Sequence, residues 1–116
     1  MIKLLTLPLT AILIAAATAA SAHAELEHAV PAVGSTVASS PSEVTLTFTE
    51  KLEPSFSGGE VRNAAGARVD YGAHVSGNIM RISVGALTAG AYSVTWHVLS
   101  VDTHKTQGSF GFNVGK

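Results

Sequence analysis

The sequence predicts an all-β domain, folded as a two-sheet antiparallel β-sandwich of about seven strands. Three observations lead to this prediction: apolar and polar residues alternate through several short segments, turn-forming residues separate these segments, and helical periodicity is nearly absent. Alternation with a period of two is typical of strands that bury one face. The chain has 116 residues, which is enough for one ordinary domain.

The clearest alternation runs through four segments, residues 44–48, 80–84, 92–99 and 110–114. Shorter candidate strands are residues 26–30, 59–63 and 68–72. In the longest segment Trp96 and its alternate neighbours share one face, and His97 faces the other side. The spacing from Leu87 to Tyr92 resembles the tyrosine corner of immunoglobulin-like folds, in which the tyrosine hydroxyl bonds to nearby backbone. A simple packed aromatic is the alternative interpretation of Tyr92.

Residues 1–22 predict a secretory signal peptide. Lys3 provides a positive start, residues 4–17 are almost wholly apolar, and small residues follow. The apolar run is shorter than the roughly 20 residues that cross a bilayer. We therefore expect residues 23–116 to form an exported, soluble domain. Two cleavage points of the A-x-A type remain open, one before His23 and one before Glu25.

Charge and cysteine content exclude several classes of function. Lys3 is the one basic residue before His23, so six Lys and Arg remain against eight Asp and Glu, a net charge of −2 with neutral histidine. Because there is no basic run, we expect no binding of nucleic acid or of an anionic membrane. The chain has no cysteine, so its stability must come from packing rather than from disulfides.

Asp102 and His104 are the first candidate metal ligands. They lie two residues apart, so in extended backbone their side chains point to the same side. Such a pair is compatible with a metal site, with an acid/base pair, or with two ordinary turn residues. If cleavage exposes His23, its α-amine and imidazole add two nitrogens that lose their protons readily near neutral pH. Three nitrogens and one oxygen favour Cu(II), which also leads the divalent affinity order.

Several motifs in order resemble the CopC family of copper-resistance proteins. They are A-H at 22–23, P-A-V-G-S at 31–35, L-T-F-T-E-K-L at 46–52, F-S-G at 56–58, A-G-A-Y-S-V-T-W-H-V-L-S-V-D-T-H at 89–104 and G-S-F-G-F-N-V at 108–114. The resemblance covers essentially all of the chain after the predicted signal peptide. The W-x-V-x-S-x-D-x-H block combined with the A-H junction is specific, whereas each part alone is weak.

The resemblance implies a periplasmic Greek-key sandwich, cupredoxin-like or immunoglobulin-like, that binds one Cu(II) ion. The ligands it implies are the amine and imidazole of His23 together with Asp102 and His104. Glu50 would be a hydrogen-bond partner of a ligand or a weak ligand itself, with a plain surface carboxylate as the alternative. The family also implies a monomeric binding protein rather than an enzyme, working with an inner-membrane partner of the CopD type.

The chain departs from the family pattern at two places. Residues 63–78 contain no methionine, so we expect no separate Cu(I) site in that region. Lys105 stands where many relatives have proline, a change that removes no ligand. Of the other histidines, we expect His74 and His97 to be structural or on the surface. We expect His28 to be solvated, with an accessory ligand as the alternative.

Three alternative functions remain open from the residues. A copper-dependent oxidase also uses an N-terminal histidine, but it needs a broad substrate-binding face and an open copper position. A metal-free immunoglobulin-like interaction module would show no effect of copper on its melting temperature. Zinc also accepts histidine and carboxylate ligands, so the ligand types alone do not exclude it.

Overall fold

The computed structural model of the chain describes residues 24–115. The predicted signal peptide and His23 lie outside the described residues.

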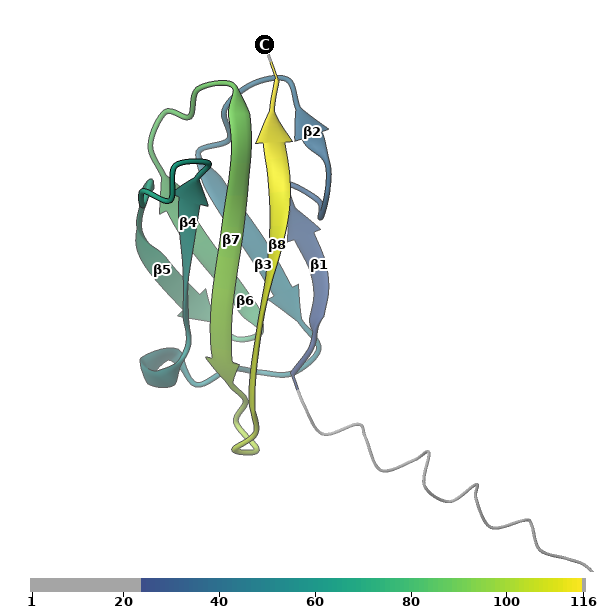
Figure 1. Cartoon of the computed structure of the whole chain (residues 1–116). Helices are drawn as coiled ribbons and strands as arrows, with labels where there is room; N and C mark the ends of the chain where they lie inside the picture. The colour runs from purple at the N-terminus through teal and green to yellow at the C-terminus, as the bar shows by residue number, and fades with distance from the viewer. Residues whose placement is uncertain (1–23, 116) are drawn as a thin grey trace, which may run out of the picture.

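Two four-stranded sheets pack face to face (Figure 1). The sheet that we call the β3 sheet has the order β1-β3-β6-β5, and the β7 sheet has the order β2-β8-β7-β4. The strands are β1 (Leu26–Val30), β2 (Thr36–Val37), β3 (Glu43–Phe48), β4 (Gly58–Asn63), β5 (Asp70–Ser76), β6 (Ile79–Val84), β7 (Gly90–Leu99) and β8 (Lys105–Val114). A 3₁₀ turn, η2 (Pro54–Phe56), precedes β4.

The predicted all-β sandwich is confirmed, with differences at the strand ends. Strand β8 begins at Lys105 rather than near Phe110, because it pairs with β7 along its whole length, from Leu99 opposite Lys105 onward. Strand β5 runs to Ser76, beyond the predicted segment. The short strand β2 was not predicted, and it pairs parallel to the end of β8 in an otherwise antiparallel sandwich.

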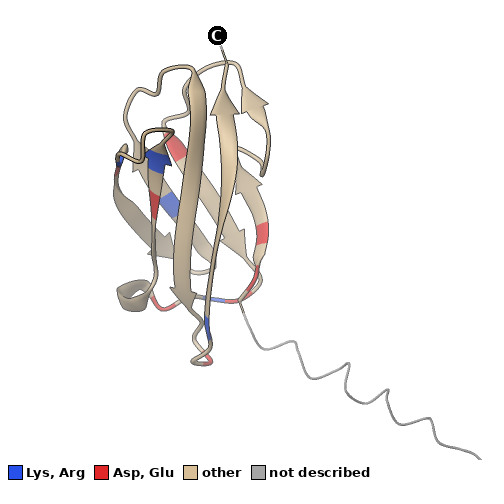
Figure 2. Cartoon of the chain, in the orientation of Figure 1, with Lys and Arg blue, Asp and Glu red and all other residues tan. Residues whose placement is uncertain are grey.

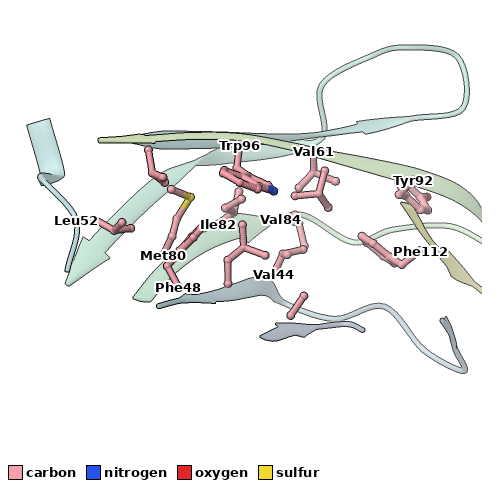
Figure 3. Close-up of a cluster of buried hydrophobic side chains, with 14 of the residues drawn as sticks. Val44, Phe48, Leu52, Val61, Met80, Ile82, Val84, Tyr92, Trp96 and Phe112 are labelled. Carbon is pink, nitrogen blue, oxygen red and sulfur yellow. The ribbon is translucent and has the colours of Figure 1, made fainter. Parts of the chain in front are cut away.

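The core lies between the sheets and consists of the alternate residues that the sequence pattern assigned to it. Strands β3, β6 and β7 bury every second side chain, which includes Val44, Leu46, Phe48, Met80, Ile82, Val94 and Val98. Figure 3 shows the cluster, with Leu52 at one end and Tyr92 and Phe112 at the other. Each buried side chain of this size contributes about 1.5–3 kcal/mol, so the core supplies the stability that disulfides would otherwise provide.

Trp96 packs into the core opposite two glycines. Its partners across the ladder are Gly59 in β4 and Gly108 in β8. A Cβ atom on Gly108 would approach Cζ2 of the indole to 2.6 Å, and one on Gly59 would approach Cδ1 of Ile82 to 2.8 Å. The ring meets Phe48 edge-on, with the ring centroids 5.0 Å apart. Gly108 thus leaves the space that the indole fills, whereas Gly59 leaves space for the side chain of Ile82.

The predicted tyrosine corner is present. The hydroxyl of Tyr92 donates a hydrogen bond to the backbone oxygen of Thr88 at 2.6 Å, and its ring stacks on Phe112. Tyr92 is therefore both a core aromatic and a tie between β7 and the loop before it.

Charged side chains are sparse on the long strands of the β7 sheet (Figure 2). Strand β7 has none and β8 has only Lys105, whereas β4 carries Glu60 and Arg62. Among the described residues, no helix is long and apolar enough to cross a membrane.

A buried carboxylate ties the two sheets together at one edge. The side chain of Asp70 in β5 is fully buried, and it accepts hydrogen bonds from the N–H of Val61 in β4 at 2.8 Å and from the N–H of Gly72 at 3.0 Å. Arg68 donates to the same carboxylate at 2.7 Å. Burial alone would raise the pKa of Asp70, but these hydrogen bonds outweigh it and hold the pKa below its ordinary value.

We predict that Asp70→Asn lowers the free energy of unfolding near neutral pH by about 1–3 kcal/mol, because the amide cannot replace the charged acceptor. The folded pKa of Asp70 lies below the unfolded value of about 3.9. The carboxylate therefore stabilises the fold fully above that value, and its contribution is lost as the pH falls through the folded pKa. Urea unfolding between pH 7 and pH 2 measures this: the gap between wild type and variant should close at low pH.

The matched control is Glu43→Gln, which removes an exposed carboxylate 3.6 Å from Arg81. Exposed ion pairs contribute about 0–1 kcal/mol, so this variant should stay close to wild type. A gap for Asp70→Asn that remained constant at all pH values would contradict the prediction.

Candidate metal centre

The candidate site lies in the hairpin that joins β7 to β8. Ser100 donates its N–H to the backbone oxygen of His104 at 2.9 Å, and Thr103 donates its N–H to the oxygen of Ser100 at 2.8 Å. Thr103 has a positive φ of 73°, which a tight turn requires and which L-residues adopt at some cost. The chain therefore reverses between Ser100 and His104 within very few residues.

This turn brings the two predicted ligands together. Nδ1 of His104 lies 3.3 Å from Oδ1 of Asp102, and their side chains are 44% and 42% exposed. The spacing of Asp102 and His104 predicted that both side chains lie on one side of an extended strand. In the structure a turn through Thr103 brings them together instead. A carboxylate oxygen and an imidazole nitrogen thus converge at a solvent-accessible position, as a metal site needs.

Ser100 holds Asp102 and His104 in place through hydrogen bonds from a buried position. It is fully buried, and its hydroxyl donates a short hydrogen bond to Oδ1 of Asp102. The backbone N–H of His104 in turn lies 3.3 Å from the same hydroxyl oxygen. Ser100 was not among the predicted site residues. The signal that could have identified it is a polar residue at the next inward-facing position after Val98.

The carboxyl of Asp102 is held in its ionised form. The main cause is the hydrogen bond from the Ser100 hydroxyl, which lowers the pKa of Asp102 below its ordinary value. Partial burial is the next largest cause and acts in the opposite direction, but the hydrogen bond and the charge of His104 lower the pKa further. An ionised carboxylate is the form that binds a cation.

Glu50 lies in the segment that runs beside this hairpin. Val101 donates its N–H to the oxygen of Lys51 at 3.0 Å, and Leu52 forms a β-bridge with Ser100. Glu50 is half-buried and directly precedes this pairing. It does not join the pair, however: within residues 24–115, no three or more His, Cys, Asp or Glu side chains are placed to hold a metal ion.

The first described residues are fixed next to the same end of the sandwich. Ala24 is fully buried, and its backbone oxygen accepts a hydrogen bond from the hydroxyl of Thr106 at 2.7 Å. Glu25 donates its N–H to the hydroxyl of Thr49 at 2.9 Å, and Thr49 donates its own N–H to the oxygen of Glu25 at 2.9 Å. These bonds were not predicted, because they join residues far apart in the sequence.

The remaining described histidines lie elsewhere. His97 is exposed on the outer side of β7, opposite the buried face of Trp96, as predicted. His28 is exposed on β1 opposite Thr47, and His74 is exposed on β5 opposite Arg81. None of the three lies in the hairpin that holds Asp102 and His104.

The family model described as CopC domain matches residues 26–115. The chain belongs to the CopC family. The resemblance drawn from the sequence motifs is thereby confirmed. Protein YobA of Escherichia coli K12 is 34% identical over 98 residues, which cover 80% of this chain and 79% of that protein. Copper resistance protein C of Pseudomonas syringae pv. tomato is 35% identical over 105 residues, with 82% of each chain covered.

Solved CopC structures share the fold of this chain. CopC from Methylosinus trichosporium OB3b superposes with a TM-score of 0.76 at 31% identity, covering 80% of this chain and 94% of that one. PcoC from Escherichia coli, described as a methionine-rich copper resistance protein, gives a TM-score of 0.72 at 32% identity, covering 80% of this chain and 99% of that one. The CopC sandwich therefore extends over essentially all of the described residues.

We predict that Ser100→Ala raises the pKa of the Asp102 carboxyl toward its ordinary value, because the main hydrogen bond that lowers it is removed. The variant should also lose about 1–3 kcal/mol of unfolding free energy, since a buried hydrogen-bonding group disappears from the turn. NMR titration of the carboxyl carbon and urea unfolding measure the two effects. Ser93→Ala, at an exposed position of the same strand, is the control and should change neither. An unchanged Asp102 pKa in Ser100→Ala would contradict the prediction.

Proposed function

We propose that this CopC-family protein binds one Cu(II) ion in the periplasm and stores it or passes it to a partner, without catalysing a reaction. The observation that carries the proposal is the convergence of Asp102 and His104, 3.3 Å apart, at the end of the sandwich where Thr106 holds Ala24. One end of the fold thus combines an ionised carboxylate, an imidazole and the fixed start of the described chain.

His23 would complete the donor set. A peptide bond joins it to Ala24, whose backbone oxygen is held by Thr106. Thr106 follows His104 by two residues. An anchored Ala24 would therefore keep a histidine that precedes it within reach of the hairpin. A free amine and the imidazole of His23 would then join the oxygen of Asp102 and the nitrogen of His104 around one ion.

The burial of Ala24 supports cleavage before His23. Cleavage before Glu25 would remove a fully buried core residue together with the acceptor of the Thr106 hydrogen bond. We therefore favour a signal peptide of residues 1–22 and a mature domain of residues 23–116.

The donor types favour Cu(II) over Cu(I). A mixed nitrogen and oxygen set suits Cu(II), whereas Cu(I) prefers sulfur ligands. The chain has no cysteine. Met80, the one methionine outside the predicted signal peptide, is fully buried in the core. The same affinity order places Cu(II) above Zn(II) for such a site. We therefore infer a single Cu(II) site and no separate Cu(I) site.

Glu50 would act beside the ion rather than as one of its main ligands. Its place next to the Lys51–Val101 pairing brings its backbone close to the hairpin, although the two segments are far apart in the sequence. A carboxylate there would accept a hydrogen bond from the amine or imidazole of His23 and orient it.

The proposed site fits a carrier better than an oxidase. The Asp102 carboxylate would occupy a position that oxygen chemistry needs open, and no soft donor would stabilise Cu(I) during turnover. We further propose that the protein is monomeric and delivers copper to, or receives it from, an inner-membrane protein of the CopD type, as its family membership favours.

We predict that protein purified from the periplasm has the mass of a chain that starts at His23 and that it retains one Cu(II) ion after one equivalent is added. Intact mass spectrometry under denaturing conditions identifies the first residue, and native mass spectrometry counts the bound ion. A chain that starts at Glu25 would lack two of the four donors and would overturn the proposal. A second ion held equally tightly would contradict the single site.

We predict that His104→Ala and Asp102→Asn each weaken Cu(II) binding by more than the roughly 10–100-fold that loss of a ligand's hydrogen-bond partner costs. Each substitution removes a direct donor from the ion. Competition with a chelator of known affinity measures the dissociation constant. His97→Ala is the matched control, because His97 is an exposed histidine outside the hairpin, and it should bind like wild type. Equal losses in all three variants would indicate nonspecific histidine binding instead.

A further inference from the structure

We propose that Thr106 is a positioning residue for the amino-terminal copper donors. Its hydroxyl holds the backbone of Ala24, the residue that follows His23, at the start of the strand that follows His104. This inference rests on the proposed function and adds to it a residue that would restrict where the amino-terminal donors can lie.

The anchoring is built from both sheets. Thr106 in β8 donates its hydroxyl to the oxygen of Ala24 at 2.7 Å. On the other side, Thr49, which directly follows β3, exchanges two hydrogen bonds with Glu25, each of 2.9 Å. The methyl group of Ala24 is fully buried in the core. Two consecutive residues are thus held by hydroxyl groups from opposite layers.

The position of Thr106 explains why a side chain makes this contact. Strand β2 meets β8 only near its end, at Asn113 and Val114. The beginning of β8 therefore has no ladder with β2 at the edge where the chain enters the fold. Figure 1 shows the first described residues arriving there, between β1 and the start of β8. A hydroxyl that reaches across from β8 replaces the missing backbone pairing.

The anchor lies two residues after the candidate ligand. Thr106 pairs with Val98 in the ladder of β7 and β8, and the backbone oxygen of His104 accepts the N–H of Ser100, so both residues belong to one hairpin. Two residues of chain span at most about 7 Å. The anchor therefore sets where the chain end meets the hairpin, and rigid placement of donors is what gives a metal site its affinity.

The test uses the mature protein, with His23 confirmed as its first residue by mass. The variants are Thr106→Val, which keeps the shape of the side chain but cannot donate, and Thr106→Ser, which restores the hydroxyl. Thr49→Val tests the anchor from the opposite sheet. The matched control is Thr47→Val, a half-buried strand threonine that contacts neither Ala24 nor Glu25 in this anchor.

Three quantities are measured: the Cu(II) dissociation constant by chelator competition, the Cu(II) EPR spectrum, and hydrogen exchange of the Glu25 amide in the metal-free protein. For Thr106→Val we expect binding to weaken about tenfold or more, the nitrogen hyperfine pattern to change, and the Glu25 amide to exchange faster. Thr49→Val should do the same, Thr106→Ser should restore all three quantities, and Thr47→Val should leave them unchanged.

The inference is overturned if wild type binds tightly while Thr106→Val and Thr49→Val keep its affinity and EPR spectrum, even if both variants melt at a lower temperature. That result would make the threonines purely structural and leave the proposed function intact. If wild type that starts at His23 binds no copper, both the proposed function and this inference fail. Hydrogen exchange of the Glu25 amide separates these two outcomes further, because it shows in the metal-free protein whether the hydrogen bonds of the anchor are intact.

Discussion

The inward-facing column of β7 determines where this protein can carry chemistry. From Tyr92 to Val98 the column is apolar and packs into the core, and its next position is the buried hydroxyl of Ser100. A hydroxyl buried without a partner costs free energy, so Ser100 requires acceptors and donors close by. It finds them in the carboxylate of Asp102 and the backbone of His104. Core packing and ligand placement are thus parts of one hydrogen-bonded unit.

The sequence was sufficient for the fold, and it singled out the two side chains that the hairpin brings together, but it did not show how they come together. The alternation through β3, β6 and β7 identified the buried faces correctly, because one residue in two must face the core. Asp102 and His104 were chosen by their spacing, yet a turn through Thr103 brings them together. That turn depends on a positive φ that no periodicity reveals.

The residues that were missed are those whose roles depend on distant partners. Thr106 and Ala24 are 82 positions apart, and nothing in either local segment indicates that they meet. Strand β2 was missed because two residues are too few to show alternation, and its parallel pairing to β8 arises only once the sandwich closes. Both Ser100 and Thr106 can nevertheless be recognised in the sequence, because each is a polar residue at an inward-facing position of an otherwise apolar alternating pattern.

The shared use of the chain's start by the core and by the proposed site has a chemical consequence. In the uncleaved chain, the nitrogen of residue 23 is a peptide amide, whose lone pair is delocalised into the carbonyl and binds metal poorly. The proposed cleavage before His23 would turn it into an amine with a pKa of about 8, which releases its proton readily to a metal. Asp102 and His104 alone offer two donors, so the precursor would hold copper weakly. Under the proposed function, the full site therefore assembles only after export, in the compartment where the protein would meet Cu(II).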